Sequence, residues 1–375
     1  MDHASAREAH ELRSVIDRLR GYAAAVVVVS GVFSIGSNAA ELGLPSRFPL
    51  IPVESGSALS VLAWRTSNPA SAQSADWFQA SPATSPSGRK GHAMTYGLVG
   101  QLMLFGGVNS GGVLNDTWIW GGTNWTQLSP STSPNARSDH AMAFRPGQII
   151  LFGGIDAAGF LNDTWSWDGT NWTQLSPATS PPARAAHAMA YNPVTDQMIL
   201  FGGVNFGGPL NDTWLWDGTN WTQLSPLNSP DARRGAAMTF DWAHLQMVLF
   251  GGQGTSDTFN DTWLWDGTNW TQLAPPESPS ARDSAAIAYD SAHEQLVLFG
   301  GTSPGGILDD TWAWGGTNWT QLNPPHSPSA RYRSAMASDL VRGGLVLFGG
   351  NDFDSYLNDT WRISGDVIFV GGFDL

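Results

Sequence analysis

Three histidines occupy equivalent positions in successive stretches of the chain: His92, His140 and His187. Three imidazoles make a common zinc site when they converge on one point. The next three equivalent positions hold no further histidine but Ala236, Ala285 and Ser334. We therefore predict a turn or hydrogen-bonding role for the histidines, and neither a metal nor another cofactor.

One arginine and one aspartate recur with the same period. The arginines are Arg89, Arg137, Arg184, Arg233, Arg282 and Arg331. The aspartates are Asp116, Asp163, Asp212, Asp261, Asp310 and Asp359. A ring of six arginines would suit an anionic ligand, but a residue repeated in every unit usually serves what all units share. Equal numbers of the two charges predict a structural ion pair or turn clamp in each unit.

Other positions differ between units, namely the two residues after each arginine and the loop after each Gly-Gly pair. Function usually resides in loops held by a rigid scaffold. We predict that a protein or glycan ligand binds at Lys90, Asp139, Arg234, Asp283, Tyr332, Arg333, Asn109, Asp156, Phe206 and Asp352. Asp139 and Asp283 would also suit acid–base chemistry if they faced one another. Since no nucleophile elbow, phosphate loop or zinc motif is present, we assign no catalytic residue.

The elements that must position these residues form a repeat. A Gly-Gly pair closes an apolar run at Gly106 and five further times, at intervals of 47 and then 49 residues. A complete unit has four short runs, which in the first unit are residues 92–96, 102–107, 116–120 and 124–128. The wholly apolar second run predicts a strand covered on both faces. The third run carries a tryptophan for packing between units, and these are Trp118, Trp165, Trp214, Trp263, Trp312 and Trp361.

The ends of the repeat predict a closed ring of six four-stranded blades. Trp77 opens a fourth-type run with no unit before it, whereas the sixth unit lacks a fourth run after Trp361. The N-terminal run can therefore complete the last blade and remove an open sheet edge. A seventh blade, built from residues 60–65 and 367–372, is the alternative.

Together, the Gly-Gly pair, the Asp-Thr-Trp strand, the following tryptophan and the arginine before the next strand resemble kelch repeats over residues 76–363. The resemblance implies an all-β, galactose oxidase-like propeller with many known uses, among them protein interaction, copper-radical oxidation and sialic acid mutarotation. The copper oxidases use a tyrosine cross-linked to cysteine, and this chain has no cysteine. The resemblance therefore leaves enzymatic activity open but implies no copper chemistry.

The first 40 residues predict a short helical signal or membrane-anchor segment. Four arginines precede an apolar run from Tyr22 to Ile35, which is shorter than the roughly 20 residues of a membrane-spanning helix. A cleaved export signal, an anchor through residues 21–36, and a segment without a targeting role all remain open. Residues 41–75 are interpreted as a linker, and residues 76–375 as the propeller.

The net charge of −14 argues against nucleic-acid binding. We expect a monomeric, extracytoplasmic, non-enzymatic binding module that presents one loop face to a protein or glycan. A carbohydrate-active isomerase or lyase with its site at the channel mouth is one alternative. A structural envelope or adhesion protein is the other.

Overall fold

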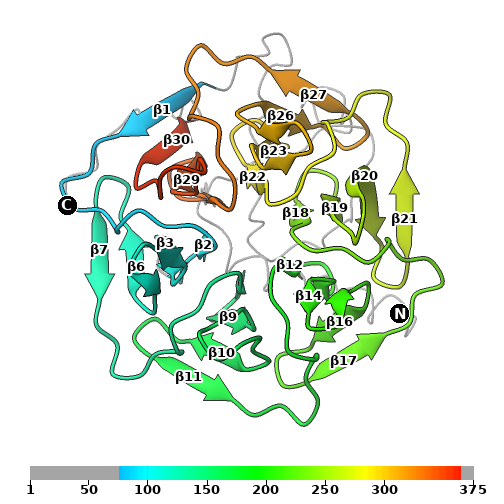
Figure 1. The fold of residues 1–375 in the computed structure, drawn as a ribbon, viewed down its shortest axis with the longest axis horizontal. Helices are drawn as coiled ribbons and strands as arrows, with labels where there is room; N and C mark the ends of the chain where they lie inside the picture. The colour runs from blue at the N-terminus through cyan, green and yellow to red at the C-terminus, as the bar shows by residue number, and fades with distance from the viewer. Residues whose placement is uncertain (1–75, 99, 365–375) are drawn as a thin grey trace, which may run out of the picture. The chain divides into compact units, whose positions relative to one another are not determined.

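The computed structural model describes residues 76–98 and 100–364. These residues form six four-stranded antiparallel sheets arranged as blades around a central channel (Figure 1). The innermost strands contact one another in the cyclic order β2, β8, β12, β18, β22 and β28, and β28 contacts β2 again. Because the last blade packs directly on the first, six blades are confirmed and the seven-bladed alternative is wrong.

We number the blades in chain order. From the innermost strand outward, blade 1 contains β2 (Ala93–Tyr96), β3 (Leu102–Phe105), β6 (Thr117–Trp120) and β7 (Trp125–Leu128). Blade 2 contains β8 (Ala141–Arg145), β9 (Gln148–Phe152), β10 (Thr164–Trp167) and β11 (Trp172–Leu175). Blade 3 contains β12 (Ala188–Asn192), β13 (Gln197–Phe201), β16 (Thr213–Trp216) and β17 (Trp221–Leu224).

Blade 4 contains β18 (Ala237–Asp241), β19 (Gln246–Gln253), β20 (Thr258–Trp265) and β21 (Trp270–Leu273). Blade 5 contains β22 (Ala286–Asp290), β23 (Gln295–Phe299), β26 (Thr311–Trp314) and β27 (Trp319–Leu322). Blade 6 contains β28 (Ala335–Ser338), β29 (Gly344–Phe348), β30 (Thr360–Ser364) and β1 (Trp77–Ala80). Loop hairpins add β4 (Val108–Asn109), β5 (Gly112–Val113), β14 (Val204–Asn205), β15 (Gly208–Pro209), β24 (Thr302–Ser303) and β25 (Gly306–Ile307).

The core lies between the blades. In β3 every side chain is buried, because neighbouring blades cover both faces of the strand. The cluster between blades 6 and 1 joins Leu104 and Trp125 of one blade to Val346 and Phe348 of the other. The Trp125 indole also donates to the Thr360 hydroxyl at 2.9 Å. Tryptophan therefore provides both apolar area and a buried hydrogen bond at each junction of this type.

The N-terminal strand closes the ring as predicted. Strand β1 pairs with β30 in antiparallel register, with Trp77 opposite Ile363. The Trp77 indole is fully buried and donates to Thr311 Oγ1 of blade 5 at 3.1 Å. This pairing gives blade 6 its fourth strand and covers the edge that β30 would otherwise expose.

A belt of side-chain hydrogen bonds links the outer strands of adjacent blades. The asparagine before each outer strand accepts a backbone N–H from the preceding blade, as Asn124 does from Ala83 at 2.7 Å. The equivalent asparagines in blades 2 to 5 are Asn171, Asn220, Asn269 and Asn318. In blade 6 the position holds Asp76, which accepts the His326 N–H at 3.0 Å and contacts the His326 ring at 3.0 Å.

Several predictions concern residues outside the described ranges. These are the signal or anchor segment within residues 1–40, the linker to residue 75 with its strand at 60–65, and the tail at 367–372. Within residues 76–98 and 100–364 there is no helix long and apolar enough to cross a membrane.

Candidate functional site: the channel mouth and its loops

The repeated arginine of each blade is the centre of a buried clamp. Arg89 Nη1 and Nη2 donate to the two carboxylate oxygens of Asp116 at 2.6 and 2.7 Å. Nη1 also donates to the Gly106 carbonyl at 2.9 Å, and Nε donates to the Ser87 carbonyl at 3.0 Å. The same arginine–aspartate pair forms in the other five blades. Each guanidinium therefore ties the loop before the first strand to the second and third strands.

The clamp also sets the charge of its carboxylate. Burial alone would raise the pKa of Asp116, but the hydrogen bonds and charge of Arg89, with the Trp118 indole, hold that pKa below its ordinary value. The equivalent aspartates of blades 2, 3, 5 and 6 have lowered pKa values for the same reasons. The clamps are neutral pairs, so they do not form a ring of free cations for an anionic ligand.

The Gly-Gly pairs allow the next blade to approach closely. Gly106 has φ +64, and a Cβ atom there would lie 2.8 Å from the Arg137 carbonyl oxygen of blade 2. The N–H of Gly107 donates to that same carbonyl at 2.9 Å. Only glycine accommodates both the positive φ and the short contact.

A closed ring of six main-chain hydrogen bonds surrounds the channel mouth. The residue two after each clamp arginine donates its N–H to the carbonyl of the equivalent residue one blade earlier, at 2.7–3.0 Å. The members are Gly91, Asp139, Ala186, Gly235, Ser284 and Arg333. All six have φ between +52 and +63, in the left-handed region that favours glycine. The main chain is therefore uniform around the mouth, whereas the side chains it presents are not.

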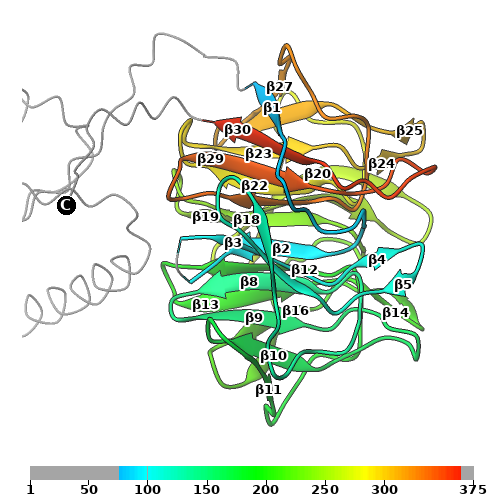
Figure 2. The ribbon, with the colours of Figure 1, turned by 90° about the vertical axis from the view of Figure 1, so that its left-hand side faces the viewer.

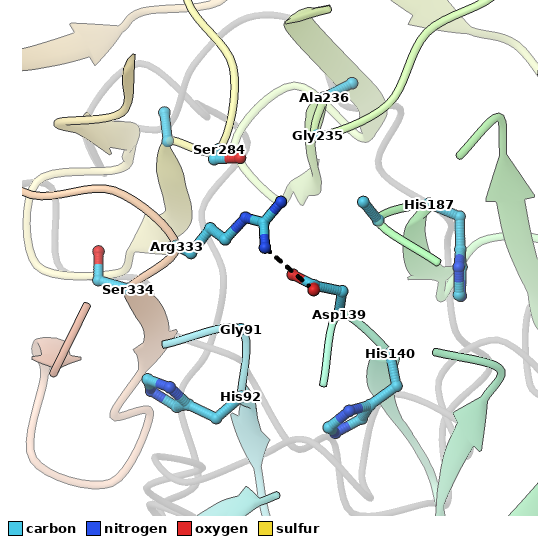
Figure 3. Close-up of a pocket in the computed structure, with 12 residues that line it drawn as sticks. Gly91, His92, Asp139, His140, His187, Gly235, Ala236, Ser284, Arg333 and Ser334 are labelled. Carbon is cyan, nitrogen blue, oxygen red and sulfur yellow. Dashed lines mark hydrogen bonds and ion pairs between the residues drawn. The ribbon is translucent and has the colours of Figure 1, made fainter. Parts of the chain in front are cut away.

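The ring encloses a hollow of about 130 Å³ (Figure 3). Arg333 extends across the hollow, and its Nη1 contacts Asp139 Oδ2 at 3.1 Å. Gly91 lies between these two residues in the ring, and a Cβ atom on it would lie 2.8 Å from Asp139 Oδ1. The absence of a side chain at Gly91 therefore leaves room for an ion pair between blades 6 and 2.

The predicted turn or hydrogen-bonding role of the three histidines stays a prediction. His92, His140 and His187 are buried, and among the described residues their ring nitrogens make no well-aligned hydrogen bond, although each ring lies close enough to the main chain of a phenylalanine in the preceding blade to raise its pKa slightly. Each ring instead packs edge-on against a phenylalanine of the preceding blade, as His92 does on Phe348 with a centroid distance of 5.6 Å. The histidines therefore fill the junctions between blades.

Burial makes these imidazoles hard to protonate. For His92, burial and then the Arg89 guanidinium lower the pKa to about 3, outweighing the nearby Asp116 carboxylate. Burial and Arg184 lower the pKa of His187 to about 3 in the same way. For His140 the pKa is also well below its ordinary value, because of burial and Arg137.

The predicted ligand-binding residues beside the clamps lie on one face but have local partners. Lys90 Nζ donates to the Tyr332 hydroxyl at 2.8 Å and lies over the Tyr332 ring. Arg234 donates to the Gln253 side chain, with Nη2 at 2.7 Å. Asp283 accepts from the Thr302 hydroxyl at 2.5 Å. Asp139 and Asp283 thus have separate partners, and nothing in these contacts couples them as an acid–base pair.

The loops after the Gly-Gly pairs lie on the same face as the channel mouth, which we call the mouth face. Isolated bridges join the two sets of loops, for example Lys90 to Val108 and Tyr332 to Asn351. In Figure 2 the hairpins β4–β5 and β24–β25 protrude on one side of the propeller. Of the predicted residues in these loops, Asn109, Asp156 and Asp352 accept N–H groups of their own turns. Phe206 is 88% exposed.

Sequence reasoning missed two aromatic residues of this face. Phe353 is 65% exposed with φ +78, and its ring packs at a tilt against Tyr332 with a centroid distance of 5.4 Å. Phe160 packs against Phe206 at 4.9 Å. Both are aromatic residues in loops that vary between repeats, which is a signal that the sequence contains. The other repeats have no equivalent aromatic residue, however, so the sequence did not indicate where these two side chains lie.

Within the part of the chain that the structure describes, no group of three or more histidine, cysteine, aspartate or glutamate side chains is arranged to hold a metal ion. No curated protein matches the chain. The model of the KLHDC2/KLHL20/DRC7 kelch-repeats domain matches residues 69–182 and 169–314. With the six clamped blades and their Gly-Gly pairs, this match shows that the chain belongs to the kelch-repeat family.

Proposed function

We propose that the propeller is a non-enzymatic module that binds a partner protein through its mouth face. Kelch propellers commonly bind proteins. One observation carries the assignment to this face: six main-chain positions around the mouth, equivalent in hydrogen bonding and in φ, present Gly, Asp, Ala, Gly, Ser and Arg. A scaffold that is constant in its backbone but varied in its presented side chains is suited to recognition rather than to repeated structural contact.

The electrostatics of the mouth support a polar partner. Asp139 and Arg333 line the hollow, and Lys90, Arg234 and Asp283 directly precede three other members of the ring, so the mouth carries both signs of charge. Mixed charges fix the orientation of a bound protein and disfavour wrong partners. A glycan is the alternative ligand, and the variants described next can be tested against glycans in the same way.

Random 12-residue peptides displayed on phage and selected on the immobilised full-length protein provide the test. The triple alanine variant of Arg234, Asp283 and Tyr332 is expected to bind the selected peptides at least tenfold more weakly. A loss of about 1.4 kcal/mol of binding free energy corresponds to that factor. The matched control replaces Val194, Leu245 and Val341, which are exposed in loops between the first and second strands at the other ends of those strands. If the selected peptides bind the parent protein and both triple variants with equal affinity, the assignment to the mouth face is refuted.

We further propose that the protein is exported or tethered to a membrane by its N-terminal apolar segment, with the basic residues before Tyr22 as support. Cell fractionation followed by N-terminal sequencing measures this. Mature protein beginning near residue 40, or intact protein in the membrane fraction, is the expected result. Intact protein in the soluble cytoplasmic fraction would contradict it.

A further inference from the structure

Two phenylalanines project from the mouth face on opposite sides of the ring. Phe206 belongs to the hairpin β14–β15 of blade 3 and is 88% exposed, and Phe353 belongs to the loop of blade 6 and is 65% exposed. Each packs against a second aromatic ring: Phe206 lies edge-to-face with Phe160, and Phe353 lies at a tilt to Tyr332. Exposed aromatic rings of this kind are typical anchors of protein interfaces.

Local contacts hold the Phe353 loop in place. The N–H of Phe353 donates to Asn351 Oδ1 at 3.1 Å, and the Asn351 amide donates to the Ser355 carbonyl at 2.7 Å. Asp352 Oδ1 accepts the N–H of Ser355 at 2.6 Å. An anchor that is already ordered loses little conformational freedom when a partner binds.

The loop that carries Phe353 is acidic, and the loop of blade 2 against which Phe206 packs contains Asp156. The six loops between the Gly-Gly pairs and the clamp aspartates contain no lysine or arginine, but they contain the five carboxylates Asp156, Asp257, Asp309, Asp352 and Asp354. None of these five forms an ion pair with another described residue. Of the cations at the mouth, Lys90 donates to Tyr332 and Arg333 donates to Asp139.

From this juxtaposition we infer that the mouth face binds a basic segment of its partner, in which arginine or lysine alternates with apolar side chains. A guanidinium or ammonium group stacks on the exposed ring of Phe353 and meets the carboxylates of Asp352 and Asp354 beside it. A second contact point of the same kind is formed by Phe206 and Asp156, because Phe206 packs against the loop that contains Asp156. This inference rests on the proposed function and specifies the chemistry of the partner.

Binding of two synthetic peptides to the full-length protein tests the inference. The first repeats arginine, glycine, leucine and serine three times, and the second has glutamate in place of arginine. We expect the arginine peptide to bind at least tenfold more tightly, and its affinity to fall as salt is raised because exposed charges are screened. The variant Phe206→Ser/Phe353→Ser is expected to lower that affinity about tenfold, whereas Phe78→Ser, at a half-exposed ring on β1, leaves it unchanged.

The charge contribution has its own matched pair of variants. Asp352→Asn/Asp354→Asn removes two carboxylates beside Phe353, and Asp231→Asn/Glu277→Gln removes two exposed carboxylates from loops between blades. Only the first variant is expected to bind the arginine peptide more weakly, by several-fold. Equal binding of both peptides, or equal effects of both variants, would overturn the inference. If phage-selected peptides depend on Arg234, Asp283 and Tyr332 but are acidic, the inference fails while the proposed function stands.

Discussion

Lowering the pH from 7 to 5 is expected to remove about 4 kcal/mol from the free energy of unfolding through His92 and His187 alone. Their folded pKa values of about 3 keep both imidazoles neutral at pH 5. In the unfolded chain a histidine has a pKa near 6.5 and takes up a proton, so the unfolded state gains about 2 kcal/mol per residue at pH 5. Since a depressed histidine pKa favours the unfolded state at lower pH, stability falls as pH decreases from about 6.5 toward 3. His140 shifts in the same direction and adds to the effect.

Urea unfolding followed by tryptophan fluorescence at pH 7 and pH 5 measures this loss. The informative variant is His92→Ala/His140→Ala/His187→Ala, because blades 4 and 5 already have alanine at this position. It will be less stable at pH 7 through lost packing, but most of the difference between the two pH values should disappear. The control is His326→Ala, whose side chain is 69% exposed. A pH dependence that is the same in the triple variant and the parent would show that the imidazoles are not its source.

Replacing a clamp arginine is the substitution with the largest expected cost at neutral pH. Arg233→Ala should destabilise the protein by about 3–5 kcal/mol, because it leaves the Asp261 carboxylate and the Gly251 carbonyl without their shared donor in a buried position. It also removes the guanidinium that lies 3.9 Å from the Phe259 ring centroid. Arg233→Lys should recover only part of the loss, since an ammonium group cannot match the bidentate geometry.

The neighbouring arginine provides the matched control. Arg234 is adjacent in sequence and has the same charge, but it lies on the mouth face and bonds only to Gln253 among the described residues. Arg234→Ala is expected to change the free energy of unfolding by no more than about 1 kcal/mol. Equal effects at the two positions, measured by urea unfolding at pH 7, would mean that the clamp is not what stabilises the blade.

The clamp carboxylates act in a different pH window from the histidines. Asp116 and its equivalents with lowered pKa values contribute stability that is fully present above their unfolded pKa of about 4. That contribution is lost as pH falls through the lower folded pKa. Acid unfolding should therefore have an early phase from histidine and a later one from aspartate.

The parts of the fold that repeat were predictable from the sequence. The Gly-Gly pair recurs six times, and its spacing predicted the blades. The fourth run is missing from the last unit but present before the first, at Trp77, and this predicted how the ring closes. The pairing of arginine with aspartate followed from their equal numbers.

Features that depend on one blade meeting another were not predictable. Asp139 and Arg333 are 194 residues apart, and their contact requires both ring closure and the absence of a side chain at Gly91. The left-handed conformation of Ala186 and Arg333 is imposed by the ring of hydrogen bonds and not by their residue types. The packing of the histidines was not predictable because their partners, such as Phe348, belong to a different repeat.

That the mouth is stitched together by peptide groups has an evolutionary consequence. Exchanging a side chain at any of the six encircling positions removes none of the six main-chain bonds. The mouth can therefore present new side-chain chemistry without weakening the propeller. The restriction is conformational: β-branched residues are poorly tolerated at positive φ, while glycine, serine, aspartate and asparagine are acceptable. The binding specificity of the mouth can therefore change during evolution by substitution among these few residue types, while the architecture stays the same.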